Sequence, residues 1–324
     1  MATDVHGVDY QDRTRLLAVI GVLLLAIGGV AAFLGPVEMH TFTFFSEGGR
    51  FHYEGFGFGS FMFGNIATQI VGYYLIAMVL VPLGYGHLRP RRWARTLSLT
   101  LLGFWLVLGV PLIFVFLFIL FSSKELSIPA AVIALVIVGF SYPALPVLLI
   151  RFYQSRNVRL TFERRDPKTY WTERRPRSIL VLSALFTLYL VALHILIFFN
   201  GLFPVFGIWL SGLEGIVLLD MAILWLVCLI WGTMRMNRWA WWAALGSFTV
   251  LTASWVVTLA MSSWSDLLLE LDFPPYEMDI LEGLPFQGWH FAVLVGIPLA
   301  LTLGVLIWFR RDFEPLRLRW QDET

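Results

Sequence analysis

Charged residues and cysteine are both scarce in this sequence of 324 residues. Asp, Glu, Lys and Arg make up 14% of it, against about a quarter in soluble domains, while 58% is hydrophobic. This composition excludes an intrinsically disordered chain and a soluble nucleic-acid-binding protein. The single cysteine, Cys228, cannot form an internal disulfide, which excludes a disulfide scaffold and dithiol redox chemistry.

The motifs of the common enzyme classes are also missing. The sequence has no phosphate-binding Walker loop, no Gly-rich dinucleotide fingerprint, no His-Glu-x-x-His zinc motif and no Gly-x-Ser-x-Gly nucleophile elbow. No apolar window carries two histidines at metal-ligand spacing. The sequence therefore favours a protein without enzyme activity, and it predicts no catalytic residue, no metal site and no cofactor.

Long apolar runs, by contrast, are abundant. A helix needs about 20 apolar residues to cross the hydrocarbon core of a bilayer. Windows of this length occupy residues 15–34, 60–83, 97–121, 129–150, 178–199, 205–231, 241–262 and 290–309. They are continuous in Leu, Val, Ile, Phe and Ala instead of alternating, which argues against the strands of a membrane barrel. The sequence predicts an all-α integral membrane protein with eight transmembrane helices in a lipid bilayer.

Basic residues lie almost entirely on one side of the predicted spans. The two terminal segments and the connections after the second, fourth and sixth spans hold 21 Lys and Arg, counting Arg15 at the edge of the first window, with 10 acids. The other connections hold 2 basic residues and 10 acids. Under the positive-inside rule, both termini are expected in the cytoplasm. Because 21 of the basic residues are Arg and only 2 are Lys, we expect the plasma membrane of a prokaryote.

One segment of the sequence occurs twice. Gly86–Ala94 reads GHLRPRRWA and Gly232–Ala240 reads GTMRMNRWA, with Gly, both Arg, Trp and Ala identical. Each copy follows an even-numbered span and precedes the next one. We predict a duplication into two parallel four-helix repeats, 1–166 and 167–324, related by an axis along the membrane normal.

The Arg and Trp residues of the repeated segment are expected to anchor helix ends at the membrane interface. A cation is favourable near the C-terminus of a helix, and Arg also binds anionic headgroups. Trp prefers the depth of the headgroups. A regulatory lipid site is the alternative interpretation. The predicted anchors are Arg89, Arg92, Trp93, Arg235, Arg238 and Trp239.

Two connections on the side opposite the basic residues have unusual compositions. Aromatic residues alternate through 39–58 around a Gly-Gly pair, which predicts a small outer β-hairpin in the first repeat. The acidic loop 263–289 of the second repeat has six carboxylates and no basic residue. Its pattern predicts two short amphipathic helices, at 265–272 and 275–283. Either connection is a candidate surface for a membrane-protein partner, and the carboxylate spacing is not that of a calcium loop.

Three ionisable residues fall inside the predicted spans, where a charge is costly and often functional. His194 is on the fifth span, and Glu214 and Asp220 are on the sixth. A tight turn joins these spans, so His194 and Glu214 are expected at a comparable depth, within reach of one another. Glu214 and Asp220 are six positions apart, which separates them by about 120° around a helix. Together they form the candidate intramembrane polar site.

Three interpretations of this site remain open. A proton-coupled small-solute transporter would use Glu214 or Asp220 as its titrating carboxylate. A metal or haem site would need more ligands than His194 and His290 supply. In the third interpretation, the carboxylates are protonated or hydrogen-bonded between helices, and the protein is a non-enzymatic accessory or assembly protein. The sequence favours the third, with the transporter as the alternative.

Overall fold

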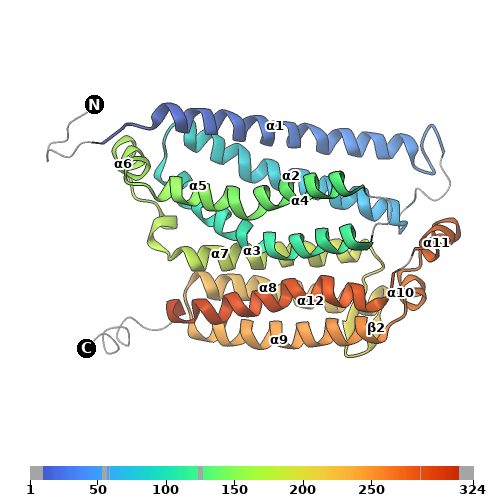
Figure 1. The fold of residues 1–324 in the computed structure, drawn as a ribbon. Coiled ribbons are helices and arrows are strands. Elements are labelled where there is room, and N and C mark those ends of the chain that lie inside the picture. The colour runs from blue at the N-terminus through green and yellow to red at the C-terminus, as the bar shows by residue number, and fades with distance from the viewer. Residues whose placement is uncertain (1–9, 53–56, 58, 123–126, 285, 314–324) are drawn as a thin grey trace. The chain divides into compact units, whose positions relative to one another are not determined.

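The computed structural model describes residues 10–52, 57, 59–122, 127–284 and 286–313, which are mainly helical (Figure 1). The longer helices are α1 (Thr14–Phe45), α2 (Phe61–Leu88), α3 (Arg92–Ser122), α7 (Arg177–Ile197), α8 (Gly212–Met234), α9 (Arg238–Met261) and α12 (Gly288–Trp308). The shorter helices are α4 (Ile128–Gly139), α5 (Leu145–Gln154), α6 (Arg156–Arg165), α10 (Trp264–Leu271) and α11 (Pro275–Glu282). Single turns are η1 (Phe140–Ala144), η2 (Trp171–Arg174) and η3 (Phe309–Phe313), and β1 (Phe203–Val205) and β2 (Ile208–Leu210) are the strands.

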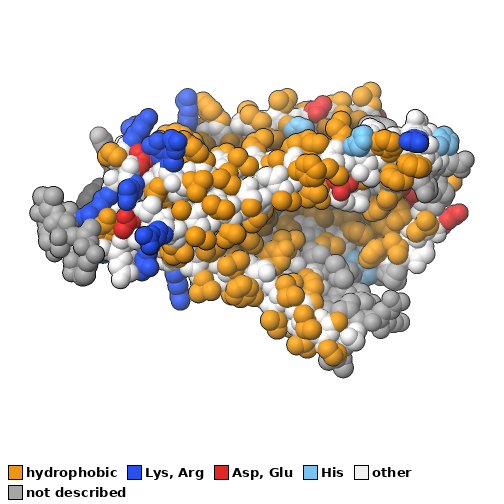
Figure 2. All heavy atoms as spheres, turned by 90° about the horizontal axis from the view of Figure 1, so that it is seen from above, with side chains coloured by type: hydrophobic (Ala, Val, Ile, Leu, Met, Phe, Trp, Pro, Cys, Tyr) orange, Lys and Arg blue, Asp and Glu red, His pale blue; other side chains and the backbone are white. Residues whose placement is uncertain are grey.

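Eight helical segments in the described part of the chain are long and apolar enough to cross a membrane. They fall on the eight predicted windows, so the chain is a multi-pass helical membrane protein. The fourth segment, Pro129–Gln154, is α4 and α5 joined through the π-helical turn η1. That turn contains Pro143, which has no N–H for the helical ladder. Figure 2 shows hydrophobic side chains over the flanks of the helices and Lys and Arg side chains toward helix ends.

The chain divides into two compact units, each made of two separate stretches. The first unit is Met1–Ala31 with Leu75–Val181, and the second is Ala32–Tyr74 with Leu182–Thr324. These units reflect packing, and the boundary passes through α1, α2 and α7. The predicted repeats at 1–166 and 167–324 concern ancestry, so they stay a prediction.

The core of the first unit lies where helix ends of α1, α2, α3 and α5 meet α6. Its buried residues are Leu17, Leu83, Ala94, Leu99, Leu102, Tyr153, Val158 and Phe162. The buried imidazole of His87 is satisfied within this core: its Nδ1 donates to the carbonyl of Leu83 at 2.7 Å, and its Nε2 accepts from the Tyr153 hydroxyl at 2.6 Å. The core therefore ties the short helix α6 to the ends of the spans.

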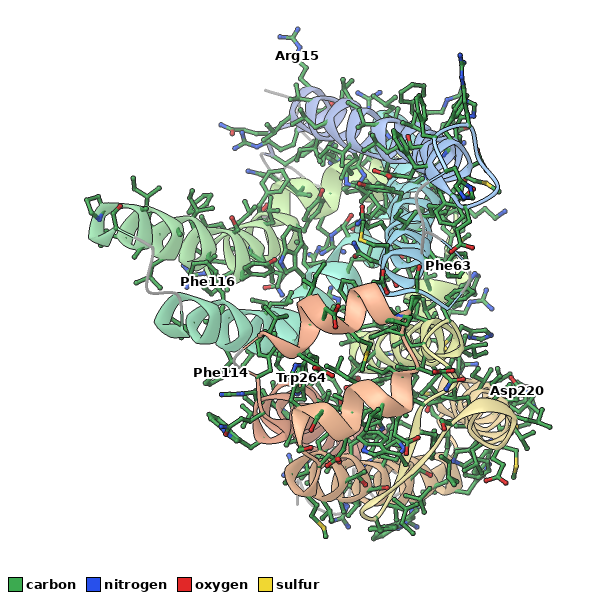
Figure 3. All side chains as sticks on the ribbon, turned by 90° about the vertical axis from the view of Figure 1, so that its right-hand side faces the viewer. Arg15, Phe63, Phe114, Phe116, Asp220 and Trp264 are labelled. Carbon is green, nitrogen blue, oxygen red and sulfur yellow. The ribbon has the colours of Figure 1, made fainter. Side chains whose placement is uncertain are left out.

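In the second unit, α9 packs along α12 and the acidic loop folds as α10 and α11. The two predicted short helices are confirmed, including the start at Pro275 and the end at Gly283. The Trp264 ring (labelled in Figure 3) stacks on Phe291 at 5.2 Å, and its indole N–H donates to the Leu281 carbonyl at 2.9 Å. This side chain thus joins α10 to α11 and α12.

Three of the six acids in 263–289 accept hydrogen bonds, one within the loop and two from segments outside it. Hydrogen bonds from Ser263 to Asp266 cap α10, and they hold the pKa of that carboxyl below its usual value. Glu270 accepts a hydrogen bond from the Ser211 hydroxyl at 2.9 Å. Glu277, only 5% exposed, accepts the backbone N–H groups of Phe61 at 2.7 Å and of the next residue at 3.2 Å. It therefore caps the N-terminus of α2, where a negative charge is favourable.

The predicted outer hairpin at 39–58 requires correction. Helix α1 continues to Phe45, so the first predicted strand is helical, and residues 53–56 and 58 lie outside the described residues. Thr43 donates to the carbonyl of His40 at 2.7 Å, and the ring of His40 packs on Phe44 at 4.6 Å. Residues three or four positions apart lie on the same face of a helix and contact one another there. A run with aromatics at alternate positions therefore also contains pairs with helical spacing. The antiparallel strands that the structure does contain are β1 and β2, between α7 and α8.

Candidate functional site

The structure places the three predicted intramembrane residues on exposed faces of their helices, away from neighbouring helices. His194 on α7 and Glu214 and Asp220 on α8 are all exposed. The His194 Nδ1 donates to the carbonyl of Leu190 at 2.7 Å, one turn earlier in the same helix. Among the described residues, no hydrogen bond or ion pair joins any two of the three side chains.

The two carboxylates lie at different depths along α8. Glu214 is in the first turn of the helix, where the positive end of the helix dipole favours a negative charge. Asp220 lies eight residues after the first residue of α8, which corresponds to about 12 Å along the axis. Figure 3 shows Asp220 on the outer edge of the second unit's helices. Within the part of the chain that the structure describes, its carboxylate has no hydrogen-bond or ion-pair partner.

Asp220 is the centre of an exposed stripe along α8. The stripe consists of Leu213, Val217, Asp220, Leu224, Val227 and Trp231, which we call the α8 seam. Its residues are spaced alternately by four and three positions, the spacing with which two helices pack at a shallow angle. The opposite face of α8, which includes Leu219, Ile223 and Leu226, is buried. Hence α8 uses one face for its own unit and presents the other outward.

The two copies of the repeated segment form the same local structure. In the first copy, Arg91 N–H donates to the Gly86 carbonyl at 2.7 Å, and in the second, Asn237 N–H donates to the Gly232 carbonyl at 3.0 Å. The guanidinium of Arg89 lies 5.4 Å from the centroid of the Tyr85 ring, and Arg235 lies 4.2 Å from that of Trp231. Both copies are therefore sharp corners that join two spans.

The shared Gly and Ala residues explain why both corners can be tight. A Cβ atom built on Gly86 would lie 2.6 Å from the Ala94 Cβ, and one on Gly232 would lie 2.7 Å from the Ala240 Cβ. Larger side chains would force the two helices of either corner apart. The pattern that the two segments share thus has a packing cause, and the duplication stays a prediction.

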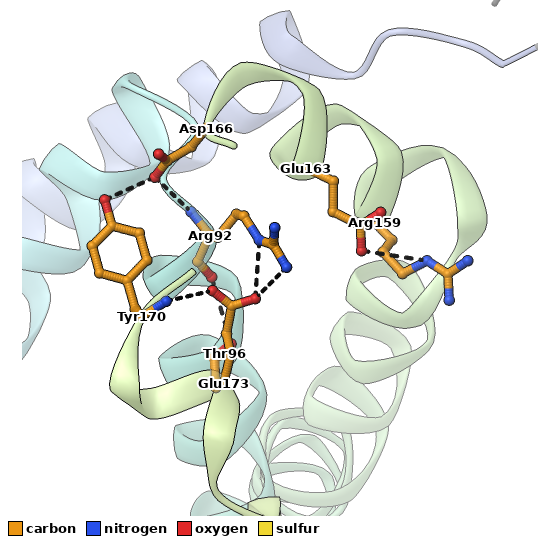
Figure 4. A network of polar contacts seen from close by, with 7 residues as sticks. All are labelled: Arg92, Thr96, Arg159, Glu163, Asp166, Tyr170 and Glu173. Carbon is orange, nitrogen blue, oxygen red and sulfur yellow. Dashed lines mark hydrogen bonds and ion pairs between the residues drawn. The ribbon is translucent and has the colours of Figure 1, made fainter. Parts of the chain in front are cut away.

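Arg92 has a further role in the first unit, shown in Figure 4. Its guanidinium pairs with Glu173 at 2.6 Å, and its backbone N–H donates to Asp166 at 3.3 Å. The Asp166 side chain, 3% exposed, also accepts the Tyr170 hydroxyl at 3.0 Å. Arg92 therefore ties the segment after α6 to the start of α3, whereas its counterpart Arg238 is exposed.

The second unit contains a cavity of 590 Å³ between α7, α8, α9 and the hairpin. Its walls are almost entirely apolar, with Leu193 on α7, Leu226 on α8 and Leu251 on α9. None of the three predicted intramembrane residues lines it. Sequence reasoning missed this cavity because it depends on which helix faces meet.

Each polar group in the cavity wall already has a partner. The Tyr189 hydroxyl lies 2.7 Å from that of Thr302, and the Trp225 indole N–H donates to the Ser247 hydroxyl at 2.8 Å. The Ser254 hydroxyl donates to the Pro204 carbonyl at 2.7 Å. The cavity is therefore apolar in chemistry as well as in composition.

The β1–β2 hairpin forms one lip of this cavity. Its turn residues, Phe206 and Gly207, both have positive φ values, of 44° and 98°, as a two-residue type I′ turn requires. The N–H of Phe206 donates to Ser254 at 3.1 Å, and that of Gly207 donates to Thr258 at 2.8 Å. These bonds satisfy irregular backbone beside the spanning helix α9. Gly207 within the apolar run 203–210 was the one local signal of a turn, because Gly readily adopts a positive φ.

The described residues contain no group of three or more His, Cys, Asp or Glu side chains placed to hold a metal ion. Comparison with models of known protein families, with curated protein sequences and with solved structures finds no match to this chain. The exposed Asp220 carboxylate of α8 and the apolar cavity are therefore the features of the described residues that bear on function.

Proposed function

We propose that this chain is a non-enzymatic accessory or assembly protein whose α8 seam binds a spanning helix of a different membrane protein. The observation that carries this proposal is the position of Asp220, which is exposed more than two turns inside a spanning helix. A carboxylate that faces hydrocarbon is costly, and a partner at the same depth removes that cost. The apolar residues of the seam supply packing around it.

The partner is a protein that carries Lys or Arg within a spanning helix. A counter-charge opposite Asp220 is the arrangement that best stabilises an ionised carboxylate away from water. The eight apolar windows of this chain contain no Lys or Arg except Arg15 at the edge of the first. A second copy of the chain would therefore bring another Asp220 to the seam, and no counter-charge for it.

We further propose that the chain lies in the plasma membrane of a prokaryote with both termini in the cytoplasm. The strong excess of basic residues on one set of connections supports this orientation. On the opposite side, Asp272, Asp279 and Glu282 are exposed, which makes the acidic loop a second candidate surface for the partner.

A proton-coupled small-solute transporter is the second candidate function. Two carboxylates on α8 favour it, because a titrating carboxylate in a span is the usual proton site of such carriers. That function requires Asp220 to act in the isolated protein. In vesicles containing this chain alone, it predicts solute uptake driven by a pH gradient and lost in Asp220→Asn.

The proposed contact can be tested with a photocrosslinker in intact cells. Replacing Leu224, which is 66% exposed on the seam, by p-benzoylphenylalanine should produce one discrete adduct. The same probe at the exposed Ile307 on α12 is the matched control and should not produce this adduct. Asp220→Leu should reduce the adduct about tenfold, because an interhelical polar contact contributes about 1–2 kcal/mol.

Reversing the charge at position 220 tests whether the partner carries a basic residue opposite it. Asp220→Lys should abolish the adduct, and replacing the partner's intramembrane Lys or Arg by Asp should restore it. An adduct that consists of two copies of this chain would contradict the proposal. So would an adduct whose yield is the same in wild type, Asp220→Leu and Asp220→Lys.

A further inference from the structure

We infer that the cavity of the second unit binds one hydrocarbon chain, either the acyl chain of a phospholipid or an isoprenoid chain. Its volume of 590 Å³ falls within the roughly 300–1,000 Å³ that is typical of small-molecule sites. The site is distinct from the α8 seam, since none of the seam residues lines the cavity.

The chemistry of the wall selects an apolar ligand. The hydroxyl and indole groups that reach the wall are bonded to protein partners, so they offer no recognition to a charged or sugar-like solute. Apolar cavities of this kind stay dry and take up apolar molecules. Filling the space restores dispersion contacts that its lining atoms otherwise lack.

The mouth of the cavity opens on the flank of the helices. Three of its lining residues, Trp225 on α8, Val250 on α9 and Phe206 at the hairpin tip, are also exposed on the outside of the protein. α8 and α9 both span the membrane, so this flank faces hydrocarbon. A lipid chain can therefore enter sideways between α8 and α9 without crossing water.

The hairpin tip holds a strained backbone conformation at this mouth. Phe206 has a left-handed backbone, which is strained for a bulky side chain, and hydrogen bonds to α9 hold it there. An Asn or Gly at this position would adopt the turn at lower cost. The Phe ring at the lip adds apolar contact area where an entering chain would pass.

A larger side chain in place of Gly246 should fill the cavity without displacing the residues of its wall. Gly246 lines the cavity, and a Cβ atom built on it would meet no atom within 4 Å. Gly304 on α12 is exposed, as Gly246 is, and also has open space around its Cβ position, but it does not line the cavity. Gly246→Leu and Gly304→Leu form a matched pair, because both replace a mid-helix glycine by a good helix former.

The test is photolabelling of the purified protein in phosphatidylcholine vesicles that contain phosphatidylcholine with a diazirine on its acyl chain. In the wild type, we expect labels on Leu218 and Leu251, the half-buried wall positions, as well as on the exposed Ile307. Relative to Ile307, Gly246→Leu should reduce the wall labels by about fivefold or more, which corresponds to roughly 1 kcal/mol. Gly304→Leu should leave the ratio unchanged.

Competition identifies the source of the chain. If unlabelled long-chain polyprenol at a small mole fraction removes the wall labels, the natural occupant is isoprenoid. If it does not, the occupant is a phospholipid acyl chain. The inference is overturned if the wall positions are unlabelled in the wild type, or if Gly246→Leu labels them as strongly as Gly304→Leu does.

Discussion

Phe162→Ala is expected to lower the free energy of unfolding by about 3–5 kcal/mol, the usual cost of emptying a buried aromatic site. The Phe162 ring is 0% exposed and meets the His87 imidazole edge-to-face at 5.8 Å. It is the largest buried side chain of α6, so its loss should release this helix from the ends of the spans. SDS titration in mixed micelles measures the change in stability.

Tryptic cleavage of the variant distinguishes release of α6 from global unfolding. Arg164 and Arg165 in the last turn of α6 should become cleavable in Phe162→Ala while the spans stay helical. Arg159→Ala on the exposed face of α6 is the control, with a change of about 0.5 kcal/mol or less. Equal stability of Phe162→Ala and Arg159→Ala would show that α6 does not pack on the first unit's core.

Glu277→Ala should destabilise the protein by about 3 kcal/mol, because hydrogen bonds to a charged group are worth about 1.5–3 kcal/mol each. The variant leaves the N–H groups of Phe61 and Met62 without their carboxylate and removes the negative charge from the start of α2. Glu277→Gln keeps an amide oxygen as acceptor and should lose about half as much. The midpoint of thermal unfolding in detergent measures both changes.

Asp279→Ala is the matched control for Glu277, since Asp279 lies on the same short helix and is exposed. It should change the free energy of unfolding by about 0.5 kcal/mol or less, and so leave the midpoint close to that of the wild type. Hydrogen exchange localises the effect: amides in the first turn of α2 should exchange faster only in the Glu277 variants. Uniformly faster exchange in all spans would contradict a capping role.

The features that sequence predicts well here are those set by hydrophobicity over long windows. All eight spans and the two short helices at 265–272 and 275–283 were predictable, because bilayer thickness and capping residues fix their lengths. The corner at Gly86 and its counterpart at Gly232 were visible as a repeated pattern, although the packing reason required the structure.

Short-range periodicity was less informative than window hydrophobicity. The alternating residues before Ser46 predicted a strand, yet α1 extends through them, because a helix already in progress gains a further hydrogen bond at each residue. At 203–210 the reverse occurred. The run from Phe203 to Leu210 is apolar at nearly every position, which hid a hairpin inside a predicted span.

The candidate site shows why orientation is harder to predict than position. His194, Glu214 and Asp220 lie on the predicted spans, but the direction of each side chain depends on how its helix rotates against its neighbours. In the sequence nothing distinguishes Glu277 from the other five acids of 263–289, and only the fold brings it to a backbone more than 200 residues earlier in the chain. Distant packing of this kind leaves no local pattern.

Cysteine accessibility shows whether alternate connections lie on opposite sides of the membrane, as eight spans surrounded by lipid require. In a Cys228→Ser background, single cysteines replace Gly48 and Asp279 on one set of connections and Arg89, Lys168 and Asn237 on the other. In intact cells, a membrane-impermeant maleimide should label only positions 48 and 279, and the other three should react only after permeabilisation. Reaction of position 168 in intact cells, or of 48 and 279 on different sides of the membrane, would contradict the eight-span arrangement.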